Sequence, residues 1–369
     1  SPVLSGMGSF KFPSSSENVI MKKYPVIEFH ILQSFPVSCL NRDDVGAPKT
    51  VVIGGVERLR VSSQCWKRSV RLALHEQGVK LGIRTKKVKA NLLAVLQKKG
   101  FEDTAAEKAA DTLAKSLSDD SLLFMTDKEY EAFADYAIEK NLDVSEIKSA
   151  EVAKILKKAK VASLNGLDIA LFGRMVAKAS VMNVEAAAAF SHAISTHAAS
   201  PELDFFTALD DMGGNEDDSL GAGHMGTSEY GSATYYRYIS LNLSKLVETL
   251  GIEDEPDAVR TAVEEFIKAL YTAVPAARQA TMSAACPWAY AFVLVRNGQR
   301  MQCAFEKPVR ARSQGGCLEP SIEALKAELS RQEKLSGSLY GKVASFEFGD
   351  AEGMSIDELI AGIEKAAGV

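Results

Sequence analysis

Cationic side chains gather beside two serines between Arg58 and Lys89, where ten Lys or Arg residues accompany a single acid, Glu76. The local net charge of +9 contrasts with the net charge of −5 of the whole chain. Such a concentration of one sign of charge favours an anionic partner, which the overall balance does not indicate. A helix beginning near Ser62 or Ser63 would offer that anion free backbone N–H groups, hydroxyls and the positive end of its dipole.

Helical spacing separates the side chains of this segment onto two faces. The apolar face contains Trp66, Val70, Ala73 and Leu74. The polar ridge, at i, i+3, i+4 and i+7, contains Gln64, Lys67, Arg68 and Arg71. The ridge suits successive phosphates better than one small anion. The alternative is that the serines only cap the helix and the cations only solvate it, but further basic residues from Lys80 to Lys89 favour phosphate binding.

The loop "SCLNRDD" places Arg42, Asp43 and Asp44 after the first predicted strand. An arginine at the end of a strand is well placed to reach a phosphate or a base edge. Two adjacent carboxylates can hold a metal ion, but more often they stabilise a turn. We therefore expect neither a metal nor a cofactor.

An acidic segment from Glu202 to Asp218 holds seven acids, no Lys or Arg, and the apolar residues Phe205, Phe206 and Leu209. Such a segment is a poor core element and predicts a protruding loop or hairpin. The alternative is a solvated loop with one buried Phe. The segment is complementary in charge to the basic helix, which favours a head-to-tail contact between copies of the chain.

The triplet Gly173-Arg174-Met175 ends the apolar run "LDIALF". A Met side chain presented after such a run can pack against a base without sequence preference. Core packing of Met175 is the alternative.

Signatures of catalysis are absent from the sequence. It contains no H-E-x-x-H, no G-x-S-x-G and no phosphate-binding Gly-rich loop, and His192 and His197 are five residues apart on a predicted helix. The five cysteines form no C-x-x-C and predict reduced thiols. The sequence predicts a protein that is not an enzyme.

The elements that must position these residues alternate between strands and helices. Strands are predicted at 26–33, 232–243, 288–299, 300–307 and 342–348, a pair of strands at 49–61, and helices at 256–274 and 321–332. A polar loop is predicted at 34–44, and a helical pattern fills 78–199. This layout predicts an α+β sandwich of the split β-α-β kind with a large helical insertion.

Composition and termini limit the possible locations. No apolar run approaches the length of a membrane span, and a secretion signal is not evident, so we expect a cytoplasmic protein. Residues 1–22 are rich in Ser, Gly and Pro and are expected to be a flexible extension or an expression remnant.

Seven motifs, and the order in which they occur, resemble those of a known family. They are "SCLNRDD", "RLRVSSQCWKRSVR", "GLDIALFGRM", "HAISTH", "DFFTALDD", "HMGTSEYGSATYYRYISLNL" and "AFEKPV". This is the CasC family of the RAMP superfamily, the backbone subunit of the type I-E CRISPR Cascade complex. The resemblance extends from Tyr24 to about Pro320.

The resemblance implies a hand-shaped α+β fold. Its palm would be a modified RRM/ferredoxin-like sheet (23–77 and 161–369), its fingers a helical insertion (78–160), and its thumb a hairpin (200–231). Copies would polymerise head-to-tail along the CRISPR guide RNA, grip its phosphates, splay out bases at intervals and present the rest to target DNA. The subunit would be a non-catalytic scaffold that also contacts other Cascade subunits.

The resemblance also assigns residues. Guide-RNA contacts are implied for Arg42, Asp44, Ser62, Gln64, Lys67, Arg71, Met175, Phe206, Thr207 and Lys307, and the ridge and the triplet add Arg68 and Arg174. Contacts to target DNA are expected for Lys154, Lys157 and Lys158. Phe205 stands where the family pattern would have Trp.

Two other functions remain open. One is a metal-dependent ribonuclease that uses Asp210 and Asp211 of the thumb, or Asp43 and Asp44 of the loop, because two-metal cleavage needs carboxylates close together. The other is an assembly factor whose basic helix binds an acidic protein.

Overall fold

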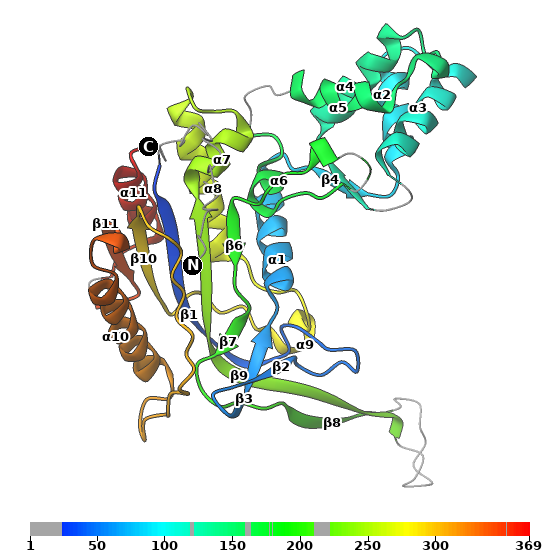
Figure 1. The fold of residues 1–369 in the computed structure, drawn as a ribbon. Helices are drawn as coiled ribbons and strands as arrows, with labels where there is room; N and C mark the ends of the chain where they lie inside the picture. The colour runs from blue at the N-terminus through cyan, green and yellow to red at the C-terminus, as the bar shows by residue number, and fades with distance from the viewer. Residues whose placement is uncertain are drawn as a thin grey trace, which may run out of the picture.

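The computed structural model describes residues 24–118, 122–158, 164–176, 178, 180–209, 222–351 and 353–369. In this part of the chain, helices accompany a nine-stranded antiparallel sheet (Figure 1). The strands of this sheet are β1 (Val26–Ser38), β2 (Thr50–Ile53), β3 (Val56–Val61), β6 (Ala188–Phe190), β7 (Ala193–Ser195), β8 (Glu202–Leu209), β9 (Ala222–Asn242), β10 (Tyr290–Arg296) and β11 (Lys342–Phe348). A separate pair consists of β4 (Ile83–Thr85) and β5 (Leu123–Met125).

The helices are α1 (Ser63–Glu76), α2 (Val88–Lys98), α3 (Thr104–Leu117), α4 (Asp127–Glu139), α5 (Ser149–Lys158), α6 (Leu167–Phe172), α7 (Leu243–Leu250), α8 (Pro256–Thr272), α9 (Gln279–Met282), α10 (Leu318–Ser336) and α11 (Ile356–Ala367). Short 3₁₀ turns are η1 (Val144–Glu146), η2 (Ser180–Met182) and η3 (Gly337–Tyr340). None of these helices is long and apolar enough to cross a membrane.

The main path of the sheet runs β11-β10-β1-β9-β7-β3-β2, with β6 and β8 also paired to β9. Helices cover both faces. Ile27, Phe29 and Ile31 of β1 join a core with residues of α1, α6, α7, α8 and α11. On the other face, Leu32 packs with Leu325 and Leu329 of α10. β1 is therefore sandwiched between two helical layers, which explains why every residue from Val26 to Gln33 is buried.

Helices α2–α5 form a lobe with its own core, which includes Tyr130, Phe133 and Leu92. The β8–β9 hairpin extends beyond the sheet, and Figure 1 shows the lobe and the hairpin projecting from opposite ends of the molecule.

Both faces of β1 are buried, including the face that carries Glu28 and His30. Glu28 and His30 are fully buried, because the segment after β10 and α10 covers that face. The carboxylate of Glu28 accepts hydrogen bonds from Arg296, from the Tyr238 hydroxyl and from the Met301 N–H, which offset its loss of water.

Other segments also differ from the sequence prediction, among them β4 and β5, which interrupt the helical pattern predicted over 78–199. β1 continues to Ser38, where a loop was predicted, because Ser34 and Phe35 still pair with β9. Residues 188–195 form β6 and β7 instead of helix, and their alanines fit where the sheet packs closely, so His192 and His197 are not on a helix. No strand forms at 300–307, where the N–H groups of Met301 and Cys303 bond the side chains of Glu28 and Tyr236.

Candidate nucleic-acid interface

Helix α1 begins where the sequence predicted. Ser62 is the N-cap, and its hydroxyl accepts a hydrogen bond from the Cys65 N–H at 3.2 Å. The Ser62 N–H donates to the side chain of Asn41 at 2.9 Å, and the Asn41 carbonyl accepts from the Lys49 N–H. These bonds hold the loop that carries Arg42 and Asp44 against the start of the helix. The predicted apolar face is confirmed, since Trp66, Val70, Ala73 and Leu74 are all buried.

The polar ridge divides into exposed and engaged residues. Gln64 and Arg68 are exposed, and Lys67 is half-buried, which lowers the pKa of its amine. Neither Lys67 nor Arg68 forms an ion pair with any carboxylate in the described part of the chain. Their charges are available to an external anion.

Arg71 of the predicted ridge is engaged in contacts within the fold. Its Nε lies 2.8 Å from Oδ2 of the fully buried Asp168, and its Nη2 donates to the Gly82 carbonyl at 2.7 Å. The guanidinium also lies 4.9 Å from the ring centroid of Phe124. Through Nε and Nη2, Arg71 ties α1 to α6 and to the residue before β4, and it neutralises the buried carboxylate of Asp168.

Two further cations lie beside the ridge and were missed by sequence reasoning. Lys49 and Arg68 both tend to lower the pKa of the Cys65 thiol, although burial raises it overall. Burial lowers the pKa of His192, and Arg60 and Lys49 lower it further. The Nη1 of Arg60 lies 3.2 Å from Nδ1 of His192. The sequence does predict the β2–β3 pair of strands. This pairing brings Lys49 and Arg60 close to the start of α1, and it is the signal from which their place at the site could have been inferred.

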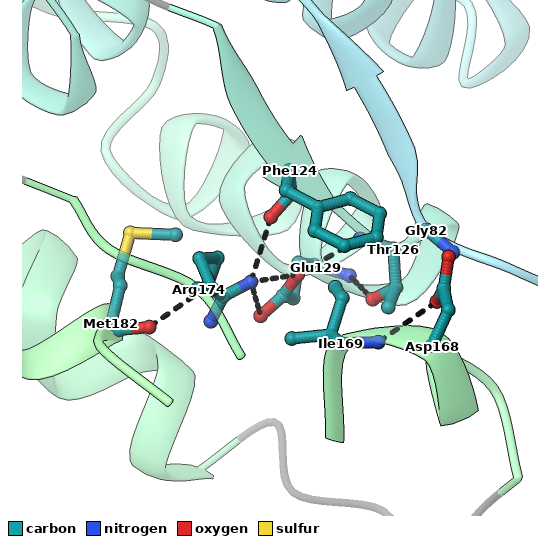
Figure 2. A network of polar contacts seen from close by, with 8 residues as sticks. All are labelled: Gly82, Phe124, Thr126, Glu129, Asp168, Ile169, Arg174 and Met182. Atoms are coloured by element: carbon teal, nitrogen blue, oxygen red, sulfur yellow. Dashed lines mark hydrogen bonds and ion pairs between the residues drawn. The ribbon is translucent and has the colours of Figure 1, made fainter. Parts of the chain in front are cut away.

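Arg174 is also engaged in contacts within the fold. Its side chain is only 5% exposed, and its Nη1 contacts both carboxylate oxygens of Glu129 at 2.9 Å (Figure 2). It also donates to the carbonyls of Met182 and Phe124. The guanidinium is therefore enclosed by the fold.

Met175 is 84% exposed, which excludes the core packing that was the alternative for it. It borders an open hollow of about 650 Å³ whose lining includes Phe172, Val184, Glu185 and Lys245. An exposed thioether beside an open hollow offers an apolar contact to a planar group.

The hairpin presents different side chains on its two faces. Leu203, Phe205 and Thr207 alternate along β8, and Met225 lies opposite Thr207, so these four share one face. Phe205 is 62% exposed. Phe206 lies on the other face, opposite Gly226, where an added Cβ would come within 2.6 Å of its ring.

Lys307 is exposed on a turn that the fold clamps in place. Arg58, counted in the basic run, is fully buried and donates to the carbonyls of Ser195, Phe305 and Glu306 at 2.8 to 3.1 Å. Phe305 has φ 46°, an unusual backbone conformation for an aromatic residue. The hydrogen bonds from Arg58 hold the backbone of the turn from which the Lys307 side chain extends.

The carboxylates considered for metal binding do not cluster. Oδ1 of Asp43 accepts from the N–H groups of Val45 and Ala47, as the turn interpretation predicted, and Asp44 is exposed. Within the described residues, no three His, Cys, Asp or Glu side chains could hold a metal ion. Asp210 and Asp211 lie outside the described residues, as do the side chains of Lys154, Lys157 and Lys158 on α5.

Comparisons with known proteins cover most of the chain. A family model described as "CT1975-like protein" matches residues 27–358. A chain of a "CRISPR RNA-guided surveillance complex, pre-nicking" is 26% identical, with a TM-score of 0.78, and the match covers 93% of this chain and 100% of that one. A chain of another "CRISPR RNA-guided surveillance complex" is 25% identical, with a TM-score of 0.60 and coverage of 93% and 99%. The comparison with curated proteins found no match.

Proposed function

The chain belongs to the CT1975-like protein family, and from this premise we propose that it is the guide-RNA-binding backbone subunit of a Cascade-type CRISPR surveillance complex. Its similarity to chains of two such complexes supports a role in association with guide RNA. The type I-E assignment, the RRM-like nature of the palm and the head-to-tail polymer are further parts of the proposal.

The observation that carries the proposal is the unneutralised cationic surface at the start of α1. Lys67 and Arg68 of the helix and Lys49 and Arg60 of the β2–β3 hairpin have no carboxylate partner among the described residues. A surface of this kind binds a nucleic-acid backbone through its phosphates and is insensitive to sequence. A guide whose sequence varies requires that insensitivity.

The remaining parts of the site follow the same logic. Phosphates would lie along Gln64, Lys67 and Arg68, with Lys307 as a further contact. Met175 would pack against an unstacked base. The β8–β9 hairpin would reach a neighbouring copy, and the bases between contacts would pair with target DNA.

We further propose that the subunit is not an enzyme. Asp43 is engaged in its own turn, and the ribonuclease alternative therefore depends on Asp210 and Asp211. Single-stranded RNA incubated with the protein and magnesium should stay intact. Cleavage that disappears in Asp210→Asn would favour the ribonuclease.

Size-exclusion chromatography with light scattering tests the scaffold. With single-stranded RNA of increasing length, the full chain should form complexes whose protein content grows with RNA length. Lys67→Glu/Arg68→Glu should abolish them. The control Arg300→Glu/Lys334→Glu makes the same change in net charge at two exposed positions and should assemble normally. A wild-type protein that stays free of RNA at low salt, alone and with its partner subunits, would overturn the proposal.

A further inference from the structure

Met175 is exposed, but the backbone on both sides of it is fixed. The N–H of Arg174 donates to the Val184 carbonyl at 2.9 Å, and the Arg174 carbonyl accepts from the Val184 N–H at the same distance. On the other side, the Val176 N–H donates to Oδ1 of Asn183 at 2.6 Å. An exposed side chain held between two pinned residues has a defined position, which is the condition for a specific contact.

The side chain of Arg174 is held by residues of the helical lobe. Glu129 belongs to α4 of that lobe, and its carboxylate holds Arg174 while also accepting from the Thr126 N–H in the capping box of the helix. The carbonyl of Phe124, on β5, accepts from the same Nη1. Figure 2 shows these groups meeting around the Arg174 guanidinium.

The same junction also holds α1. The Phe124 ring lies under the guanidinium of Arg71. The carboxylate of Asp168 accepts hydrogen bonds from Nε of Arg71 and from the Gly82 N–H. Packing here is tight, because a Cβ added at Gly82 would lie 2.9 Å from the Phe124 ring. One contiguous set of contacts therefore links Glu129, Arg174 and the base of the Lys67–Arg68 ridge.

We propose that Glu129 is a positioning residue for base recognition: through Arg174 it fixes Met175 against an unstacked base of the guide RNA. The inference rests on the proposed function of the chain. Loss of the Glu129 charge leaves the buried guanidinium without its counter-ion, so Arg174 and the residue after it shift while the exposed phosphate ridge keeps its charge.

Fluorescence of 2-aminopurine placed at successive positions of a bound single-stranded RNA reports the base contact directly. Wild-type complexes should show bright, unstacked positions at regular intervals. Glu129→Gln should lower that brightness by at least half and leave the dependence of affinity on salt unchanged. Glu131→Gln, an exposed neighbour on α4, is the matched control and should behave as wild type.

Asn183→Ala tests the same idea from the other side and keeps it falsifiable if Glu129→Gln does not fold. Asn183 is exposed, so its loss releases the Val176 N–H without opening the core. It should also reduce the bright signal. If Glu129→Gln folds and its fluorescence signal is that of the wild type, the proposal is wrong. If Glu129→Gln does not fold, a wild-type signal in Asn183→Ala would overturn the proposal instead.

A double-mutant cycle with Met175→Ala separates positioning from a structural effect. If Glu129 acts through Met175, Glu129→Gln should weaken RNA binding in the wild type by about threefold or more but add almost nothing to Met175→Ala. Fully additive losses would show that Glu129 acts elsewhere. Absence of RNA binding by the wild type would instead count against the proposed function.

Discussion

Four buried or engaged arginines stabilise the fold, whereas their exposed neighbours retain free charge. Arg58, Arg71, Arg174 and Arg296 donate to backbone carbonyls, and all but Arg58 also pair with a carboxylate. The planar guanidinium serves these sites well, because several N–H groups can reach separate acceptors at once. Lys67 and Arg68 have no such partners, which leaves them to a ligand.

Lys67→Ala and Arg71→Ala should therefore have different effects. Loss of Lys67 should flatten the log–log salt dependence of RNA binding by about 0.7 and change stability little. Loss of Arg71 should lower the free energy of unfolding by roughly 3 kcal/mol, because Asp168 would be buried without a counter-ion. Salt titrations of RNA binding and denaturant unfolding measure the two effects. Equal salt slopes in wild type and Lys67→Ala would contradict the phosphate contact.

His30 should make the folded protein sensitive to acid. Burial, and then the charge of Arg296, lower its pKa to about 3, and its Nδ1 lies 2.9 Å from the Tyr236 hydroxyl oxygen. Below pH 6.5 the unfolded chain takes up a proton that the folded protein refuses until about pH 3. The free energy of unfolding should therefore fall by up to about 1.4 kcal/mol per pH unit over that window.

Denaturant unfolding at several pH values checks this expectation. His30→Gln should show a smaller loss of stability between pH 6.5 and pH 4 than the wild type, while His75→Gln removes an exposed histidine and provides the comparison. Identical pH slopes for wild type and His30→Gln would refute the assignment.

At the scale of elements, the β2–β3 turn supports the turn that carries Lys307. Gly54 has φ 62°, and a Cβ added to it would lie 1.9 Å from the Glu306 carbonyl oxygen. Gly55 has φ 77°, but an added Cβ would meet nothing within 4 Å. The two glycines thus share a left-handed backbone conformation but differ in what an added Cβ would contact.

Substitution of each glycine by alanine isolates that contact. Both variants should lose about 1 kcal/mol of stability from the left-handed backbone conformation. Only Gly54→Ala should also displace the 305–307 turn and weaken RNA binding. Thermal unfolding and RNA titration measure the two losses, and equal RNA affinities would show that the turn does not position a contact.

Local signals explain which elements could be predicted from the sequence. Helix α1 has a serine cap and a regular apolar face, both contained within fourteen residues, so its start and its buried side were predicted. The carboxylate partners of Arg71 and Arg174 lie 97 and 45 residues away in sequence, and nothing near either arginine indicates them. The burial of Glu28 and His30 on β1 could not be predicted for the same reason, because the segment that covers them comes from the far end of the chain.

At the scale of the whole molecule, the lobe and the sheet have separate cores. Phe133 is fully buried in the lobe, and Phe266 is fully buried against the sheet. Cores that share few side chains unfold with different free energies. The molecule should therefore open in two units.

Hydrogen exchange after core truncation tests this division. Phe133→Ala should destabilise the lobe by about 3–5 kcal/mol and reduce protection in α2–α4, with protection in β1 and β10 retained. Phe266→Ala should reduce protection in β1 and β10 instead. Loss of protection in both units after either substitution would indicate a single cooperative structure.

Strand β9 has a mechanical consequence for any assembly of this chain. Its 21 residues run without interruption from the projecting hairpin to the centre of the sheet, where it pairs with β1. A force that pulls the hairpin along the strand axis would load the β1–β9 hydrogen bonds in shear, so that many must break together. Tension between neighbouring copies would thus be borne by the strongest direction of the sheet, and the fold would resist extension while the hairpin remained free to bend.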